Sequence, residues 1–118
     1  DADGDGDLDV LTHPVNGPLV FFHNNTQTQN RLVVTLQDHI GNRDGIGAIV
    51  ALTDDHGTQQ RREIQLGGGF MSFDAPWATF GFDAERGPST LSIRWADGME
   101  TQIKGLQHAT QYHVTRRD

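Results

Sequence analysis

The chain has no cysteine, so it can form neither a disulfide framework nor a thiolate site. It also lacks a long apolar run, because its longest aliphatic stretch, residues 48–52, has five residues. A membrane-crossing helix needs about 20. No segment shows the period of a long amphipathic helix, and no basic stripe is present to match a nucleic acid. These absences predict a protein with no membrane span and no nucleic-acid partner.

The acidic charge is concentrated at one end of the chain. The formal net charge is −7, and five of the 16 acidic residues lie in the first nine positions. The other 11 are nearly balanced in number by the nine basic residues. In this segment carboxylates stand at every second position, and Gly6 occupies the place where a cation-binding loop turns sharply. The pattern predicts a calcium loop. Its candidate ligands are Asp1, Asp3, Asp5, Asp7 (through its carbonyl) and Asp9.

The loop departs from a helix-loop-helix calcium site. Thr12 stands where that site has a bidentate glutamate, and the residues that follow the loop, 10–14, favour a strand over a helix. The alternative is a solvated acidic tail that binds nothing. We favour the loop because a tail has no need of strict spacing around a turn glycine.

Strand patterns dominate the rest of the sequence, separated by turn residues such as Asp97-Gly98. Many short strands at regular spacing predict an all-β fold, an antiparallel β-sandwich or barrel with an N-terminal calcium-loop hairpin. The polar stretch at 24–30 divides the chain into residues 1–28 and 29–118. The expected strands are 8–13, 19–23, 31–37, 46–53, 60–66, 70–73, 77–83, 90–95, 101–104 and 112–116.

Alternation predicts which side chains form the core. Leu32, Val34 and Leu36 share one strand face, as do Leu91, Ile93 and Trp95, and Phe80 and Phe82 point inward, which turns Trp77 outward. The segment 19–22 is apolar on both faces and cannot remain solvated. We therefore expect it to pack on the sandwich or to join a neighbouring chain, which makes a homo-oligomer possible.

Two parts of the chain resemble known families. The loop 1–9, with Val10-Leu11 and Asn16-Gly17-Pro18, resembles the last segment of an integrin-like FG-GAP or VCBS repeat, whose calcium loop joins propeller strands. From about residue 31 onward the chain resembles the ASPIC/UnbV domain, which commonly follows such repeats in bacterial secreted proteins and in a cartilage matrix protein. The matching stretches are residues 42–48, 67–72, 80–82 and 93–98. The first resemblance implies Ca²⁺ ligation by the five aspartates, and the second implies no mechanism.

The sequence gives little support to catalysis. The six histidines lack zinc-binding spacing, and no serine sits in a nucleophile elbow. Gly67-Gly68-Gly69 is followed by a poor helix start, so a bulge or a close backbone approach is expected there, not a phosphate cradle. Acidic residues outside the loop could still pair across a cleft, as in glycosidases. We expect no enzyme.

Three residues are candidates for ligand contact. Trp77 could offer a stacking platform, and Arg43 with Asp44 could form a polar recognition corner or only a turn into the next strand. The function expected is a non-catalytic, calcium-binding interaction module that is secreted, periplasmic or on the cell surface, with a protein or glycan partner. The alternatives are a carbohydrate-binding module and a calcium-assisted hydrolase.

Overall fold

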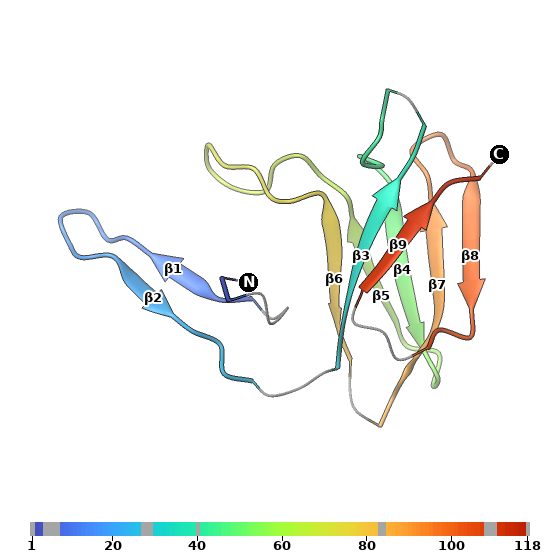
Figure 1. Ribbon diagram of the computed structural model, residues 1–118, viewed down its shortest axis with the longest axis horizontal. Helices are drawn as coiled ribbons and strands as arrows, with labels where there is room; N and C mark the ends of the chain where they lie inside the picture. Colours follow the sequence, from blue (N-terminus) through green and yellow to red (C-terminus); the bar gives the residue numbers. More distant parts are fainter. Residues whose placement is uncertain are drawn as a thin grey trace.

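The computed structural model describes residues 2–3, 8–26, 30–39, 41–82, 85–107 and 111–117. Its described part is all-β (Figure 1) and forms a two-stranded sheet β1-β2, a three-stranded sheet β6-β3-β9 and a four-stranded sheet β5-β4-β7-β8. In this part no helix has the length and hydropathy to cross a membrane. The strands are β1 Val10–Thr12, β2 Val20–Phe22, β3 Arg31–Gln37, β4 Ile49–Asp54, β5 Gln59–Glu63, β6 Trp77–Gly81, β7 Pro88–Arg94, β8 Glu100–Lys104 and β9 Gln111–Thr115.

The two larger sheets form an open sandwich around one core. Every second residue of β3 is buried, and the same alternation along β7 buries Leu91 and Ile93. Trp95 is 2% exposed, and its indole Nε1–H donates to Thr101 Oγ1 at 2.8 Å. Phe82 packs against the edge of this core. The predicted core faces are thus confirmed, and the sandwich is confirmed over the barrel, because no described ladder closes the sheets into one.

The three-stranded sheet departs from the expected antiparallel pattern at its last strand. β9 pairs in parallel with β3, whereas β6 pairs with β3 in the antiparallel sense. A parallel pair needs a crossover, and here the chain passes through the four-stranded sheet, which ends with β8 at its edge, before β9 joins β3 in the other sheet. Backbone hydrogen bonding continues past the strand, where the Arg116 N–H donates to the Gln37 carbonyl at 2.8 Å.

The β1-β2 hairpin projects away from the sandwich (Figure 1). Val10 pairs with Phe22 and Thr12 with Val20, and all six strand residues are exposed. The expectation that this segment packs on the sandwich is therefore wrong. The physical reason is that the sandwich closes its core with its own two sheets. Along β3 and β9 the described part of its three-stranded sheet turns polar side chains such as Thr35, Gln37 and His113 to the outside, so beyond Val33 and Trp77 this face offers the hairpin little apolar surface.

The connection between β5 and β6 is a second exposed apolar feature. Residues 70–73, expected as a strand, instead form a tight turn closed by a bridge between Gly69 and Ser72, with Met71 at φ 53°. A Cβ on Gly68 would meet the carboxylate end of Asp74 and one on Gly69 the hydroxyl of Ser72, and both are side-chain ends that can rotate away. The close approach at these glycines is to side chains: the nearest backbone atom, Ser72 O, would lie 3.8 Å from a Cβ on Gly67, an ordinary contact, so the close backbone approach expected there is not found.

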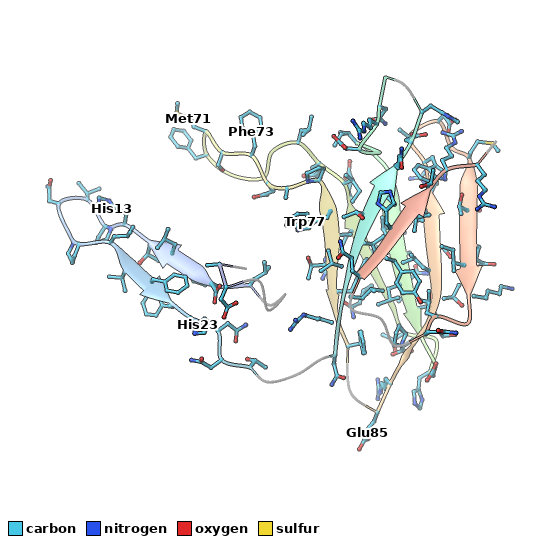
Figure 2. The ribbon with its side chains drawn as sticks, in the orientation of Figure 1. His13, His23, Met71, Phe73, Trp77 and Glu85 are labelled. Atoms are coloured by element: carbon cyan, nitrogen blue, oxygen red, sulfur yellow. The ribbon has the colours of Figure 1, made fainter. Side chains whose placement is uncertain are left out.

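That turn presents large apolar side chains to solvent. Phe70, Met71 and Phe73 are 93%, 89% and 82% exposed. We call residues 66–76 the apolar finger. Figure 2 shows Met71 and Phe73 on this finger, which extends to the same side of the sandwich as the hairpin.

Candidate functional site

The base of the hairpin holds two of the predicted calcium ligands. The backbone N–H of Ala2 donates to Asp9 Oδ2 at 2.7 Å, and that of Asn24 donates to Asp9 Oδ1 at 2.9 Å. These two hydrogen bonds, the first the stronger cause, hold the pKa of Asp9 below its usual value. Asp9 therefore favours the carboxylate form and ties the start of the loop to Asn24, the second residue after β2.

Asp3 reaches the same segment from the other side. His23 Nε2 lies 2.6 Å from Asp3 Oδ2, and Figure 2 shows His23 at the base of the hairpin. Asp3 and Asp9 thus contact adjacent residues, His23 and Asn24, although 15 positions separate Asp9 from Asn24. The fold brings both carboxylates to one place.

The donor set suits a hard cation, because it consists of carboxylate oxygens, which calcium prefers. Asp1, Asp5 and Asp7 lie outside the described residues. Among the described residues alone, no group of three or more His, Cys, Asp or Glu side chains comes together. Calcium binding by the five aspartates stays a prediction.

A second candidate site covers the outer face of the three-stranded sheet. Thr35 on the central strand lies opposite Trp77 on β6 and opposite His113 on β9. These three residues form one cross-strand row. Thr35 Oγ1 and His113 Nδ1 are 3.0 Å apart, and His113 Nε2 lies 3.2 Å from Gln37 Oε1. Trp77 is 49% exposed, which confirms that it points outward.

Arg43 and Asp44 meet this face at one end. With Thr35, Gln37, Pro76 and His113 they line a shallow hollow of about 450 Å³. Trp77 itself does not line the hollow, but its neighbour Pro76 and its cross-strand partner Thr35 do. The structure therefore gathers the three predicted ligand-contact residues around one end of the sheet.

The turn that carries Arg43 and Asp44 is held by other residues. Asn42 Oδ1 accepts from the Ile46 N–H and Asn42 Nδ2 donates to the Ile46 carbonyl, both at 2.9 Å. Gly45 adopts φ 66°, and its N–H donates to the Asn42 carbonyl at 2.9 Å. Asn42 and Gly45 therefore maintain the turn, and Arg43 and Asp44 remain exposed on its outside. The turn interpretation is correct for the backbone and leaves both side chains open to a ligand.

Sequence reasoning missed Thr35, Gln37 and His113 as members of this face. Alternation along 31–37 could have placed Thr35 and Gln37 opposite the core face. His113 could not be found in this way, because it reaches Thr35 only through the parallel β3-β9 pairing.

The comparison with protein families supplies the classification. Residues 38–118 match the family described as ASPIC and UnbV. The chain belongs to this family. A comparison with curated proteins yields no significant match.

The match starts after β3, but the folded ASPIC/UnbV unit includes that strand. β3 lies between β6 and β9 as the central strand of its sheet, and Leu32 and Val34 are fully buried in the common core. The folded unit therefore reaches back at least to Arg31. The hairpin lies outside both the matched residues and this sandwich.

Proposed function

We propose that this chain is a non-catalytic, calcium-binding interaction module of a secreted, periplasmic or cell-surface protein, and that it docks on a protein partner through the β1-β2 hairpin. The observation that carries the proposal is the exposure of the apolar hairpin: Val10, Leu11, Phe21 and Phe22 are all solvent-exposed. A lone two-stranded hairpin is only marginally stable in water, and a contiguous exposed apolar patch marks an interaction surface. The hairpin requires a covering surface, which the sandwich does not provide.

The chemistry of the hairpin indicates what kind of partner fits. Neighbouring strand residues point to opposite faces, so Phe21 and Phe22 present one ring on each side of the ribbon. Each strand also has an outer edge without a neighbour in the described part of the chain. A partner sheet could add to such an edge by main-chain hydrogen bonds while apolar side chains cover a face. The apolar finger supplies a further apolar contact on the same side of the sandwich.

Calcium has a structural role in this proposal. Asp3 and Asp9 already contact the two residues that follow β2, so a cation held by the loop 1–9 would stiffen the base of the hairpin and fix its direction. The resemblance of this segment to the end of an FG-GAP or VCBS repeat supports the same role. An open calcium loop of this type suits millimolar calcium, which favours an extracellular or cell-envelope location.

The calcium part is tested by titration calorimetry on the full chain, with a dissociation constant expected at about 10⁻⁴ to 10⁻³ M. Asp5→Ala should abolish the heat, and Asp54→Asn, a carboxylate change in the sandwich, should leave it intact. Equal heats from Asp5→Ala and wild type, or no heat from wild type at millimolar calcium, would remove the metal from the proposal.

The docking part is tested with a photo-crosslinking residue in place of Phe21, in cells that make the protein. We expect one discrete cross-linked species, which is lost when Phe22→Asp is added. The matched control carries Met99→Asp, since Met99 is an exposed apolar residue on the sandwich. A cross-link to a second copy of the chain would identify the partner as a homo-oligomer. A cross-linking pattern unchanged by Phe22→Asp would contradict docking through the hairpin.

Carbohydrate binding is the second candidate function, favoured by the Trp77-Thr35-His113 row. An exposed indole beside hydroxyl, imidazole and amide groups can stack on a sugar ring and hydrogen-bond its hydroxyls. A panel of immobilised glycans tests this, with Trp77→Ala expected to remove binding and Trp77→Phe expected to retain part of it. Glycan retention that is unaffected by Trp77→Ala would exclude this face.

A further inference from the structure

A cavity of about 440 Å³ opens at the other end of the β3-β6 ladder from Trp77. Trp77 pairs with Thr35 at one end of this ladder, and Gly81, which lines the cavity, pairs with Arg31 at the opposite end. The cavity is open to solvent at the margin where β5 approaches β6, and Thr58, Gly81 and Arg86 of its lining are exposed. Its lining includes Asn30, Asp54, Gln60, Phe82, Arg86 and Pro88.

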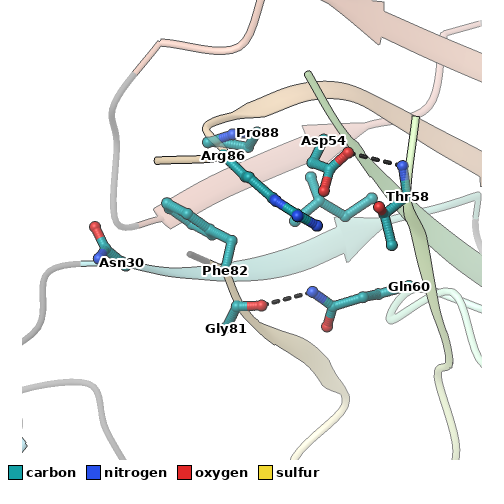
Figure 3. A pocket seen from close by; sticks show the side chains of 9 residues that line it. Asn30, Asp54, Thr58, Gln60, Gly81, Phe82, Arg86 and Pro88 are labelled. Carbon is teal, nitrogen blue, oxygen red and sulfur yellow. Dashed lines mark hydrogen bonds between the residues drawn. The ribbon is translucent and has the colours of Figure 1, made fainter. Parts of the chain in front are cut away.

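Hydrogen bonds between and within the sheets build the cavity wall. Gln60 on β5 donates from Nε2 to the Gly81 carbonyl on β6 at 2.5 Å, and so joins the two sheets (Figure 3). The Phe82 N–H donates to the Asn30 carbonyl at 3.0 Å, which holds the Phe82 ring beside the start of β3. Because Phe82 also packs against the core, the wall has a fixed aromatic surface.

The cavity contains a cation beside a carboxylate. Figure 3 shows the Arg86 side chain crossing the cavity, with its guanidinium between Phe82 and Asp54. Asp54 Oδ1 accepts from the backbone N–H groups of Thr58 at 2.7 Å and His56 at 2.9 Å. Burial raises the pKa of Asp54, but these hydrogen bonds and the charge of Arg86 outweigh burial and lower it. In the described part of the chain no ion pair is found for Arg86.

We propose that this cavity binds a carboxylate-bearing sugar, a uronic acid residue. The planar guanidinium of Arg86 pairs with the sugar carboxylate in a bidentate manner. The apolar face of the ring lies on Phe82, while ring hydroxyls donate to Asp54 and exchange hydrogen bonds with the amides of Gln60 and Asn30. The volume is at the small end of ligand pockets, which suits a single ring.

The same arrangement disfavours two other anions. A phosphate dianion brings more negative charge than a carboxylate against Asp54 and has no apolar face for Phe82. A simple carboxylate such as acetate satisfies Arg86 but leaves Phe82 and Asp54 without contacts. The proposal does not depend on the hairpin. It can therefore fail while the proposed interaction function holds, and it can hold while that function fails.

The experiment titrates the isotope-labelled full chain with methyl β-glucuronide and follows amide shifts by NMR. We expect saturable shifts at Gln60, Gly81 and Phe82. Methyl β-glucoside should bind at least tenfold more weakly, as expected for loss of a charge-assisted hydrogen bond, and inorganic phosphate should also bind at least tenfold more weakly, because it has no apolar face for Phe82 and more charge against Asp54. Arg86→Gln should weaken glucuronide binding about tenfold or more, and Arg86→Lys by less. Arg117→Gln, a charge-matched change outside the cavity, should have no effect.

Four results would overturn the proposal. The first two are that the glucuronide gives no saturable shift, or that the glucoside binds with equal affinity. The third is that Arg86→Gln binds the glucuronide as tightly as wild type does. The fourth is that Trp77→Ala loses glucuronide binding while the shifts in wild type lie on the outer face of β3. The last result would assign the sugar-binding site to the Trp77-Thr35-His113 row. The spectrum of each variant shows whether it is folded. If Arg86→Gln is misfolded, Phe82→Leu serves as a second variant, because it keeps the apolar packing and removes the aromatic ring.

Discussion

The hairpin and the sandwich use apolar residues in opposite ways. In β3, large apolar residues alternate with outward-facing ones, and Leu32, Val34 and Leu36 are buried against residues of the facing sheet. In β2, Val20, Phe21 and Phe22 follow one another directly, and all three are exposed. Alternation gives a strand one face to bury inside its own chain. A continuous apolar run gives it two, and this chain covers neither.

The two regions also differ in what holds them. The sandwich depends on a packed apolar core, with polar residues closing its margins. The hairpin has its own cross-strand pairs and a polar base made by Asp3, Asp9, His23 and Asn24. We therefore expect substitutions in the sandwich to change global unfolding. Substitutions in the hairpin should change only local order and partner binding.

The two tryptophans give the largest expected contrast in stability. Trp95→Ala leaves a cavity in the core and removes the donor to Thr101, so we expect it to lower the free energy of unfolding by about 3 to 5 kcal/mol. Trp77→Ala lies on the exposed face and should cost below about 1 kcal/mol. Urea unfolding followed by circular dichroism measures both. Equal costs would mean that the outer face is packed and not open.

Arg116 should give the next largest effect. Its guanidinium contacts Asp38 Oδ1 at 3.1 Å and Asp97 Oδ2 at 2.5 Å, and it lies over the Trp95 ring at 5.6 Å. It thus links the end of β9 to the turn between β7 and β8. We expect Arg116→Ala to lower the melting temperature at neutral pH, whereas Arg117→Ala should not.

The pH dependence of this link follows from the direction in which the pKa of Asp97 is shifted. The hydrogen bond from Arg116 is the main cause that lowers the pKa of Asp97. A carboxyl group whose pKa is lowered in the folded state stabilises the fold at pH values above its unfolded pKa of about 4. This stabilisation is lost as the pH falls through the folded-state pKa. The melting-temperature difference between wild type and Arg116→Ala should therefore shrink in acid. A difference that persists unchanged in acid far below the ordinary carboxyl range would assign the effect to packing on Trp95 instead.

Most of the sandwich could be predicted from sequence, because alternation is a local property. The expected strand at 31–37 matches β3, Arg31–Gln37, and the other sandwich strands differ from expectation by a few residues at their ends. The expected strand at 70–73 is wrong because a turn forms there, closed by the bridge between Gly69 and Ser72 with Met71 at positive φ, and the apolar residues of this segment do not indicate a turn. The parallel pairing of β9 was equally out of reach, since it joins residues 78 positions apart.

The candidate sites were predictable residue by residue, but their assembly was not. The sequence indicates Trp77, Arg43 and Asp44 separately, and only the fold gathers them around the end of one sheet. Arg86 belongs to no motif, because its interest lies in Phe82, just after β6, and Asp54, at the end of β4, which line the same cavity.

A smaller, local effect should follow from loosening the base of the hairpin. Asp9→Ala removes the acceptor for the Ala2 and Asn24 N–H groups, so hydrogen exchange of the amides in β1 and β2 should speed up, while core amides such as that of Val34 stay protected. Calcium should slow exchange in the wild-type hairpin and not in Asp9→Ala. Since the pKa of Asp9 is lowered, this protection should also be lost as the pH falls below the ordinary carboxyl range. Simultaneous acceleration in both regions would mean that they unfold as one unit.

The smallest expected effect is the sharpest test of the comparison. Removing residues 1–24 takes away the hairpin but none of the residues buried in the core. The sandwich should therefore keep its unfolding free energy within about 0.5 kcal/mol, the range of a change that touches no packed group. Urea unfolding of the full and shortened chains, each with and without calcium, measures the difference. A larger loss would show that the hairpin packs on the sandwich in solution after all, and the apolar residues of β1 and β2 would then belong to the stability of this chain and not to a partner.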